Sequence, residues 1–143
     1  MPSLAPVTIV CPAGADAQPV KIIRGYAAGA TRVDWTAFED GKSLGERGSE
    51  GGTVRRDEEH DFGARITLEE GGSIAPWSIT CGIYGWMVHT RFFGLAEEGN
   101  LEFERMKVGL DEVLQIIPLK DDATPEKMSA VSSAIEAFVE RFP

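Results

Sequence analysis

The sequence has few basic residues, and this shortage excludes two classes of partner. Lysine and arginine together number 14 against 23 acidic residues, which gives a formal net charge of -9. Nucleic acids and anionic lipids are bound through clustered basic side chains, whereas the pair Arg55 and Arg56 is followed at once by three acidic residues. We therefore expect neither a nucleic acid nor a membrane as a partner.

Cysteine is also scarce, and a secretory signal is missing from the sequence pattern. The first fifteen residues carry no charge, but they lack the basic start and the long apolar centre of such a signal. The two cysteines, Cys11 and Cys81, are therefore expected to be reduced and buried thiols without a disulfide. The expected location is cytoplasmic.

A long apolar run is absent as well. Residues 71–90 contain no charged side chain, a length that invites interpretation as a membrane span. Pro76, His89 and four glycines interrupt the segment, and such residues are costly in hydrocarbon. We expect this segment to lie inside a folded, soluble domain.

The composition is that of one globular domain. Hydrophobic residues make up 43% and charged residues 26% of the chain, both close to the averages for soluble domains. A chain of 143 residues can bury ~70% of its unfolded surface, enough for a core without disulfides or metal. We expect a single domain over residues 1–143, with a flexible glycine-rich loop at residues 39–53.

The pattern of apolar residues predicts strands first and helices last. β-branched runs and alternation of apolar with polar residues predict four strands, at residues 7–10, 20–26, 33–37 and 64–69. After Phe93 the apolar residues recur every three or four positions, as in amphipathic helices. The predicted fold is therefore α+β, with a mainly antiparallel sheet of about five to six strands and two C-terminal helices packed on one face.

The two helices have clear boundaries. The first carries an apolar stripe from Phe103 to Ile117 and ends before Pro118. The second is capped by Thr124 with proline at its first position, and its stripe reaches Phe142. Gly109 interrupts the first helix, which suggests a close approach of another element there.

Residues 77–92 predict a β-hairpin. Apolar residues are odd-numbered before Tyr84 and chiefly even-numbered after Gly85, and a turn at Tyr84-Gly85 keeps them on one face. With a two-residue loop, Cys81 lies opposite Val88. A bulge at Gly85 would also reverse the parity and stays open as an alternative.

The polar face of this hairpin carries the candidate binding residues Ser78, Thr80, His89 and Arg91. Arginine offers a fork of donors, histidine donates or accepts near neutral pH, and hydroxyl groups complete the shell of a carboxylate or phosphate. The four residues therefore predict a ligand-binding site for a small anion. The alternative is a solvated sheet surface, which is common on one side of an antiparallel sheet.

Cys81 and His89 are the candidates for a nucleophile and its base. Such a pair needs hydrogen-bond reach, but the two-residue hairpin points them to opposite faces, and a straight strand separates them by ~26 Å. A three-residue loop would place His89 diagonal to Cys81. In that register the two side chains could still form a nucleophile and base pair. We expect Cys81 to be a buried structural thiol.

His60 lies in a charged run, residues 55–63, that offers metal-ligand chemistry. An iron-type site with two histidines and one carboxylate would need both His60 and His89, and no close histidine spacing is present. The run is expected to be solvated. We expect no metal and no cofactor.

These features favour a non-catalytic binding or regulatory protein over an enzyme. No catalytic spacing is present, and the acidic helical end suggests contacts with a protein partner or with a second copy in a homodimer. The alternative is an enzyme or sensor for an anionic small molecule, with a pocket over Thr80, His89 and Arg91. In that case residues 41–53 would act as a lid.

Overall fold

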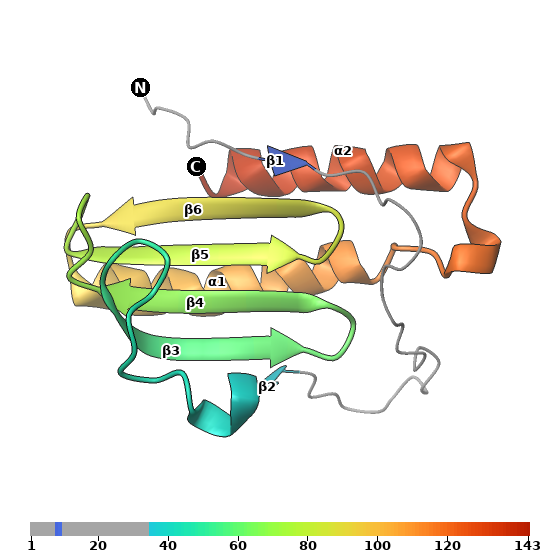
Figure 1. Ribbon diagram of the computed structural model, residues 1–143. Coiled ribbons are helices and arrows are strands. Elements are labelled where there is room, and N and C mark those ends of the chain that lie inside the picture. Colours follow the sequence, from blue (N-terminus) through green and yellow to red (C-terminus); the bar gives the residue numbers. More distant parts are fainter. Residues whose placement is uncertain (1–7, 10–34) are drawn as a thin grey trace.

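A computed structural model describes residues 8–9 and 35–143, which form one antiparallel sheet and two long helices (Figure 1). The sheet has six strands in the order β1-β6-β5-β4-β3-β2. Their bounds are Thr8–Ile9 for β1, Trp35–Ala37 for β2, Thr53–His60 for β3, Ala64–Glu70 for β4, Trp77–Ile83 for β5 and Met87–Phe93 for β6. The predicted strand at residues 20–26 and Cys11 lie outside the described residues.

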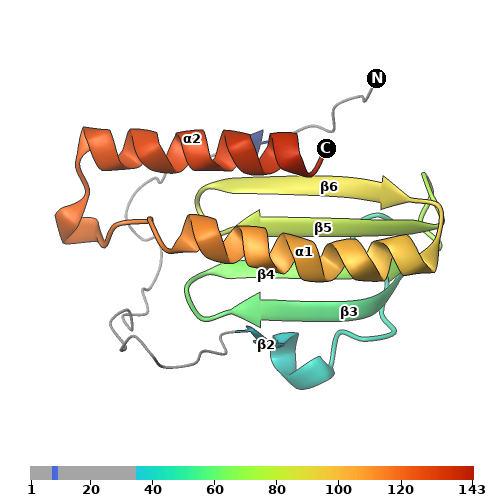
Figure 2. The ribbon, with the colours of Figure 1, turned by 180° about the vertical axis from the view of Figure 1, so that it is seen from behind.

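The helices follow the sheet in the chain and cover one of its faces. They are α1 (Ala96–Leu114) and α2 (Pro125–Arg141), and the short 3-10 helix η3 (Lys120–Asp122) lies between them. Figure 2 shows α1 lying across the middle of the sheet and α2 beside it along β6. The predicted α+β fold is thus confirmed. Within the described ranges, no helix is long and apolar enough to cross a membrane.

The core lies between this helix face and the sheet. The stripe of α1 buries Phe103, Met106 and Leu110 completely, against Ile66 of β4 and Ile79 of β5 among others. Each fully buried side chain of this size contributes roughly 1.5–3 kcal/mol from its removal from water. The periodicity that predicted the helices therefore also identifies the main source of stability.

Two local helix signals are confirmed. Thr124 caps α2, because its hydroxyl oxygen accepts a hydrogen bond of 3.1 Å from the amide of Lys127. Gly109 marks a close approach: a Cβ there would lie 2.9 Å from Phe142 and 3.0 Å from Phe138. Both aromatic rings belong to the C-terminal segment, so Gly109 lets that segment pack onto α1.

The expectation of a solvated charged run was wrong for its central residues, because β3 occupies this part of the chain. Asp57 and His60 of β3 are buried. His60 accepts a hydrogen bond of 2.9 Å at Nδ1 from the amide of Phe62, and its Nε2 lies 2.8 Å from a carboxylate oxygen of Asp111 on α1. These polar groups can be buried because distant residues supply their partners.

The predicted hairpin is present, but its register differs by one residue. The loop has three residues, Tyr84-Gly85-Trp86, so that Ile83 pairs with Met87 and Cys81 pairs directly with His89. Gly85 takes the left-handed conformation that closes such a loop (φ 83°). The two-residue loop was wrong because Trp86 is buried as a turn residue, not as the first residue of the strand.

Candidate functional site

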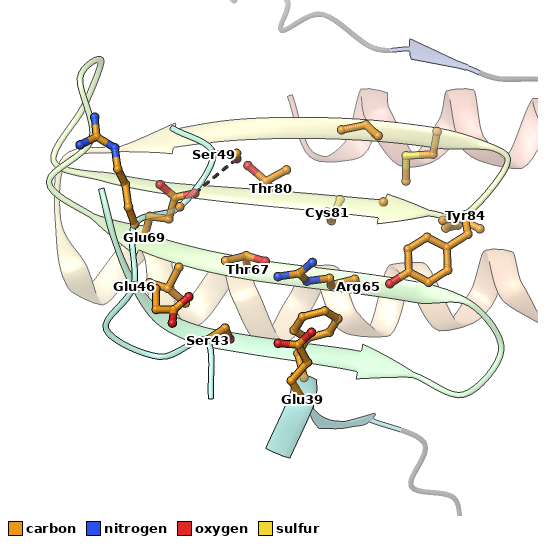
Figure 3. A pocket seen from close by; sticks show the side chains of 18 of the residues that line it. Glu39, Ser43, Glu46, Ser49, Arg65, Thr67, Glu69, Thr80, Cys81 and Tyr84 are labelled. Carbon is orange, nitrogen blue, oxygen red and sulfur yellow. Dashed lines mark hydrogen bonds between the residues drawn. The ribbon is translucent and has the colours of Figure 1, made fainter. Parts of the chain in front are cut away.

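The sheet face opposite the helices, here called the open face, contains a cavity of about 530 Å³ (Figure 3). Its floor comes from β4, β5 and β6, and one wall comes from residues 38–52, here called the covering segment. Polar and aromatic side chains line it together, among them Phe38, Arg65, Thr67, Glu69, Thr80 and Tyr84. The volume lies in the range of pockets that hold small organic molecules.

Arg65 stands in the middle of this pocket and is held by Asp57. Nε donates to one oxygen of Asp57 at 2.9 Å, and Nη2 donates to the other at 2.7 Å. This bidentate pair raises the pKa of the guanidinium. The ring of Phe38 lies below it, 3.5 Å from the guanidinium carbon. Arg65 is therefore fixed in one orientation.

Asp57 is itself a buried anchor. Its side chain has no exposed surface, and it also accepts hydrogen bonds from the hydroxyls of Ser43 (2.7 Å) and Thr67 (3.0 Å). A buried carboxylate is stable only when donors satisfy it in this way. Because Ser43 belongs to the covering segment, Asp57 joins that segment to the sheet.

Glu69 makes a second connection between the sheet and the covering segment. Its buried carboxylate accepts hydrogen bonds from the amides of Glu50 and Gly52 at 3.1 Å, and from the hydroxyl of Ser49 at 3.4 Å. Gly48 lies so close that a Cβ there would be 2.2 Å from the carboxyl carbon. The glycines of this segment thus allow it to lie against Glu69.

The covering segment begins with a left-handed turn, η2 (Phe38–Gly41). Glu39 and Asp40 have φ values of 49° and 59°, and Gly41 follows at 86°. Two successive non-glycine residues in this region cost roughly 1–2 kcal/mol each. In Figure 3 this turn directs the carboxylate of Glu39 toward Arg65.

The structure divides the predicted binding residues between the two faces. Ser78 and Thr80 lie on the open face, where Thr80 lines the pocket and its hydroxyl is 3.2 Å from that of Thr90. His89 and Arg91 lie on the helix face, opposite Cys81 and Ile79. The expected grouping on one polar face was wrong because β6 is displaced by one residue in the hairpin.

His89 and Arg91 bind the C-terminal end of the chain. Nε2 of His89 lies 2.6 Å from the carbonyl oxygen of Phe142, and Nε of Arg91 donates to the oxygen of Pro143 at 3.0 Å. Arg91 also donates to Glu102 of α1 at 2.8 Å. Burial lowers the pKa of His89 and outweighs the hydrogen bond to Phe142. These two residues hold α2 against the sheet.

Cys81 borders the pocket, but its side chain belongs to the core. It is a free cysteine with 1% exposure, as predicted for a structural thiol. Burial raises its pKa to about 12. His89 lies directly across the strand pair, but its ring is engaged with Phe142. Among the residues that the structure describes, Cys81 therefore has no activating base.

The residues that the structure describes contain no cluster of metal ligands. No group of three or more histidine, cysteine or acidic side chains there is arranged to hold a metal ion. His60 and His89 both point to the helix face and contact different partners.

Sequence reasoning missed Asp57, Arg65 and Glu69. The signal was present in β4, where Arg65, Thr67 and Glu69 alternate with apolar residues and so share one face. That pattern identifies a polar face but not the segment that covers it.

The fold and this pocket define the molecule as an α+β domain with one sheet face in the core and one open to a ligand-sized cavity. No protein-family model matches the sequence, and the searches of curated proteins and of solved structures gave no significant match.

Proposed function

We propose that this protein is a non-catalytic binding domain that holds a small organic molecule in the open-face pocket. The observation that carries the proposal is the cavity of about 530 Å³ with a fixed arginine at its centre. Pockets of this size that combine aromatic walls with a few oriented polar groups are typical ligand sites.

The contacts that hold the pocket together indicate a preformed binding site and not a chance depression in the surface. Asp57 and Glu69 are buried carboxylates, and both use their hydrogen-bonding capacity to hold the covering segment and Arg65. Burying two carboxylates costs free energy unless donors compensate for it. If this face were only a solvated sheet surface, Asp57 and Glu69 could be exposed to water without this cost.

The positions of the reactive groups favour binding without catalysis. Cys81 has a raised pKa and a core position, and His60 and His89 serve the helix face. Within the described residues, the pocket lining contains no histidine. A general base near neutral pH is most often a histidine, so the lining suits recognition better than proton transfer.

The test is a binding screen by NMR with four probes of different chemistry: spermidine, adipate, glucose and adenosine. We expect at least one to shift the amide resonances of Thr67, Thr80 and Gly82. Thr80→Phe should fill the pocket and abolish the shifts. Ser133→Phe, at an exposed position of α2 on the other side of the sheet, should retain them. If no probe shifts these resonances, the proposal fails.

A protein partner, including a second copy of the chain, is the second candidate. The observation in its favour is that Tyr84, Val88 and Phe92 are exposed on or beside the open face, at 49%, 50% and 38%. Exposed apolar side chains on a polar-rimmed face are common at protein interfaces. Light scattering over a concentration series tests the homodimer, and a monomer at every concentration would exclude it.

A further inference from the structure

The charges around the pocket indicate which class of ligand it takes. Arg65 is the basic side chain best placed to bind an anion. However, the two guanidinium nitrogens that form hydrogen bonds, Nε and Nη2, both donate to Asp57. Because Asp57 has no exposed surface, its negative charge stays beside the guanidinium. A paired arginine of this kind presents little net positive charge to a ligand.

Glu39 and Glu46 are in the opposite situation. Both line the pocket and both are exposed. Within the described part of the chain, neither side chain has a hydrogen bond or an ion pair. Figure 3 shows them set apart from each other on the covering segment. Glu39 faces Arg65 without a hydrogen bond and helps to raise the pKa of its guanidinium. Because Asp57 already neutralises Arg65, both carboxylates keep a charge that a ligand can reach at two separate points.

The surrounding residues strengthen this imbalance. The charged residues of the lining are the acidic Glu39, Glu46 and Glu69 and the basic Arg47 and Arg65. Two further acidic residues, Asp57 and Glu59, lie outside the lining on β3, beside Arg65. Glu59 is placed here because it pairs with Arg65 in the register of β3 and β4. A concave surface lined mainly by one sign of charge concentrates ligands of the other sign.

The wall beside Arg65 suits a cation with a carbon chain. Tyr84 is half exposed and stands at the end of the pocket nearest Arg65 (Figure 3). An aromatic face attracts cations and also packs against methylene groups.

We propose that the pocket binds an aliphatic amine with spaced ammonium groups, a diamine or polyamine. Glu39 and Glu46 hold two of the ammonium groups, and the chain continues over the sheet beyond Glu39 toward Tyr84, which lies at the opposite end of the pocket from Glu46 (Figure 3). This inference rests on the proposed function and names its ligand class. It reverses the sequence-based expectation of an anion, because His89 and Arg91 do not face the pocket.

Titration calorimetry at constant ionic strength tests it with spermidine and with adipate, a dianion. We expect spermidine to bind the wild type and adipate not to bind. The double variant Glu39→Gln, Glu46→Gln should weaken spermidine binding by about tenfold or more, through the loss of two charge contacts. The matched control Glu136→Gln, Glu140→Gln makes the same charge change on the exposed side of α2 and should bind as the wild type does.

Each other result overturns the inference. Equal spermidine affinity in the double variant and the wild type would mean attraction by overall charge alone. Binding of adipate, glucose or adenosine in place of spermidine would refute the amine class while the pocket remained a binding site. If none of the probes bound, the proposed function would fail as well. All four substituted residues are exposed, so circular dichroism should show the same fold in both variants.

Discussion

Buried polar residues decide the chemistry of both faces of the sheet. On the helix face, Nε2 of His89 and Nε of Arg91 are paired with the carbonyl oxygens of Phe142 and Pro143. On the open face, Asp57 and Glu69 are satisfied by hydroxyls and backbone amides of the covering segment. A buried polar group that loses its partner destabilises the folded state, so a change at any of these contacts should lower the free energy of unfolding.

His89 should make folding stability depend on pH. Its Nε2 hydrogen is directed to Phe142, so a second proton would go to Nδ1, which is buried without a partner among the described residues. The pKa is lowered in the folded state, and the unfolded chain therefore takes up the proton first as pH falls. The free energy of unfolding should be highest above about pH 6.5 and should decrease as pH falls from there.

Urea denaturation of the wild type and of His89→Gln over this range measures the effect. Glutamine keeps a donor for Phe142 but does not titrate, so the variant should lose less stability between about pH 7 and pH 5. Carboxylates titrate in both proteins, so their contributions to the change in stability cancel when the two proteins are compared. Parallel pH curves for the two proteins would show that His89 is not the titrating group.

At the scale of elements, local patterns in the sequence were sufficient for most of the architecture. Alternation identified β4, and the apolar stripes identified α1 and α2, because each of these elements buries one face of its own. The Thr124 cap and the close packing at Gly109 are equally local signals.

The hairpin register and the pocket could not be read in this way. The sequence pattern places His89 on the polar face of the hairpin with the candidate binding residues, because its actual partner, Phe142, lies 53 residues further along the chain. The wall of the pocket depends on contacts between residues 49–52 and Glu69, about twenty residues away. Such pairings are set by tertiary packing, which overrides the preference of a polar residue for water.

The attachment of the covering segment to the sheet should depend on Glu69. Replacement by glutamine removes the charge and turns Oε2, which accepts from Ser49 (3.4 Å) and from the amide of Glu50 (3.2 Å), into an NH2 group that can only donate. We expect a loss of about 1–3 kcal/mol in urea denaturation. Trypsin cleavage after Arg47, which is exposed in this segment, should become faster.

Glu70→Gln is the matched control for this loss. Glu70 is adjacent and also charged, but its ion pair with Arg55 is half exposed, with side-chain exposures of 45% and 52%. Surface pairs of this kind contribute about 0–1 kcal/mol. Equal effects of the two substitutions on cleavage after Arg47 would refute the anchoring role of Glu69.

At the scale of the whole molecule, the two faces of the sheet have separate roles. Helices and core occupy one face, and stability resides mainly there. The other face carries the pocket, whose wall is held by a few hydrogen bonds. Under the proposed function, a ligand would contact the covering segment without repacking the core, which is the usual division between a rigid scaffold and a functional loop.

Hydrogen exchange should reproduce this division. β4 and β5 are paired on both sides and covered by α1, so their amides should exchange slowest, at the free energy of global unfolding. α2 packs mainly on α1 and should open at a free energy about 2 kcal/mol lower or more, and the covering segment should exchange fastest. Mass spectrometry with rates corrected for intrinsic exchange measures this order. Exchange in α2 as slow as in β5 would mean that helices and sheet unfold as one unit, and slow exchange in the covering segment without ligand would place it in that unit too.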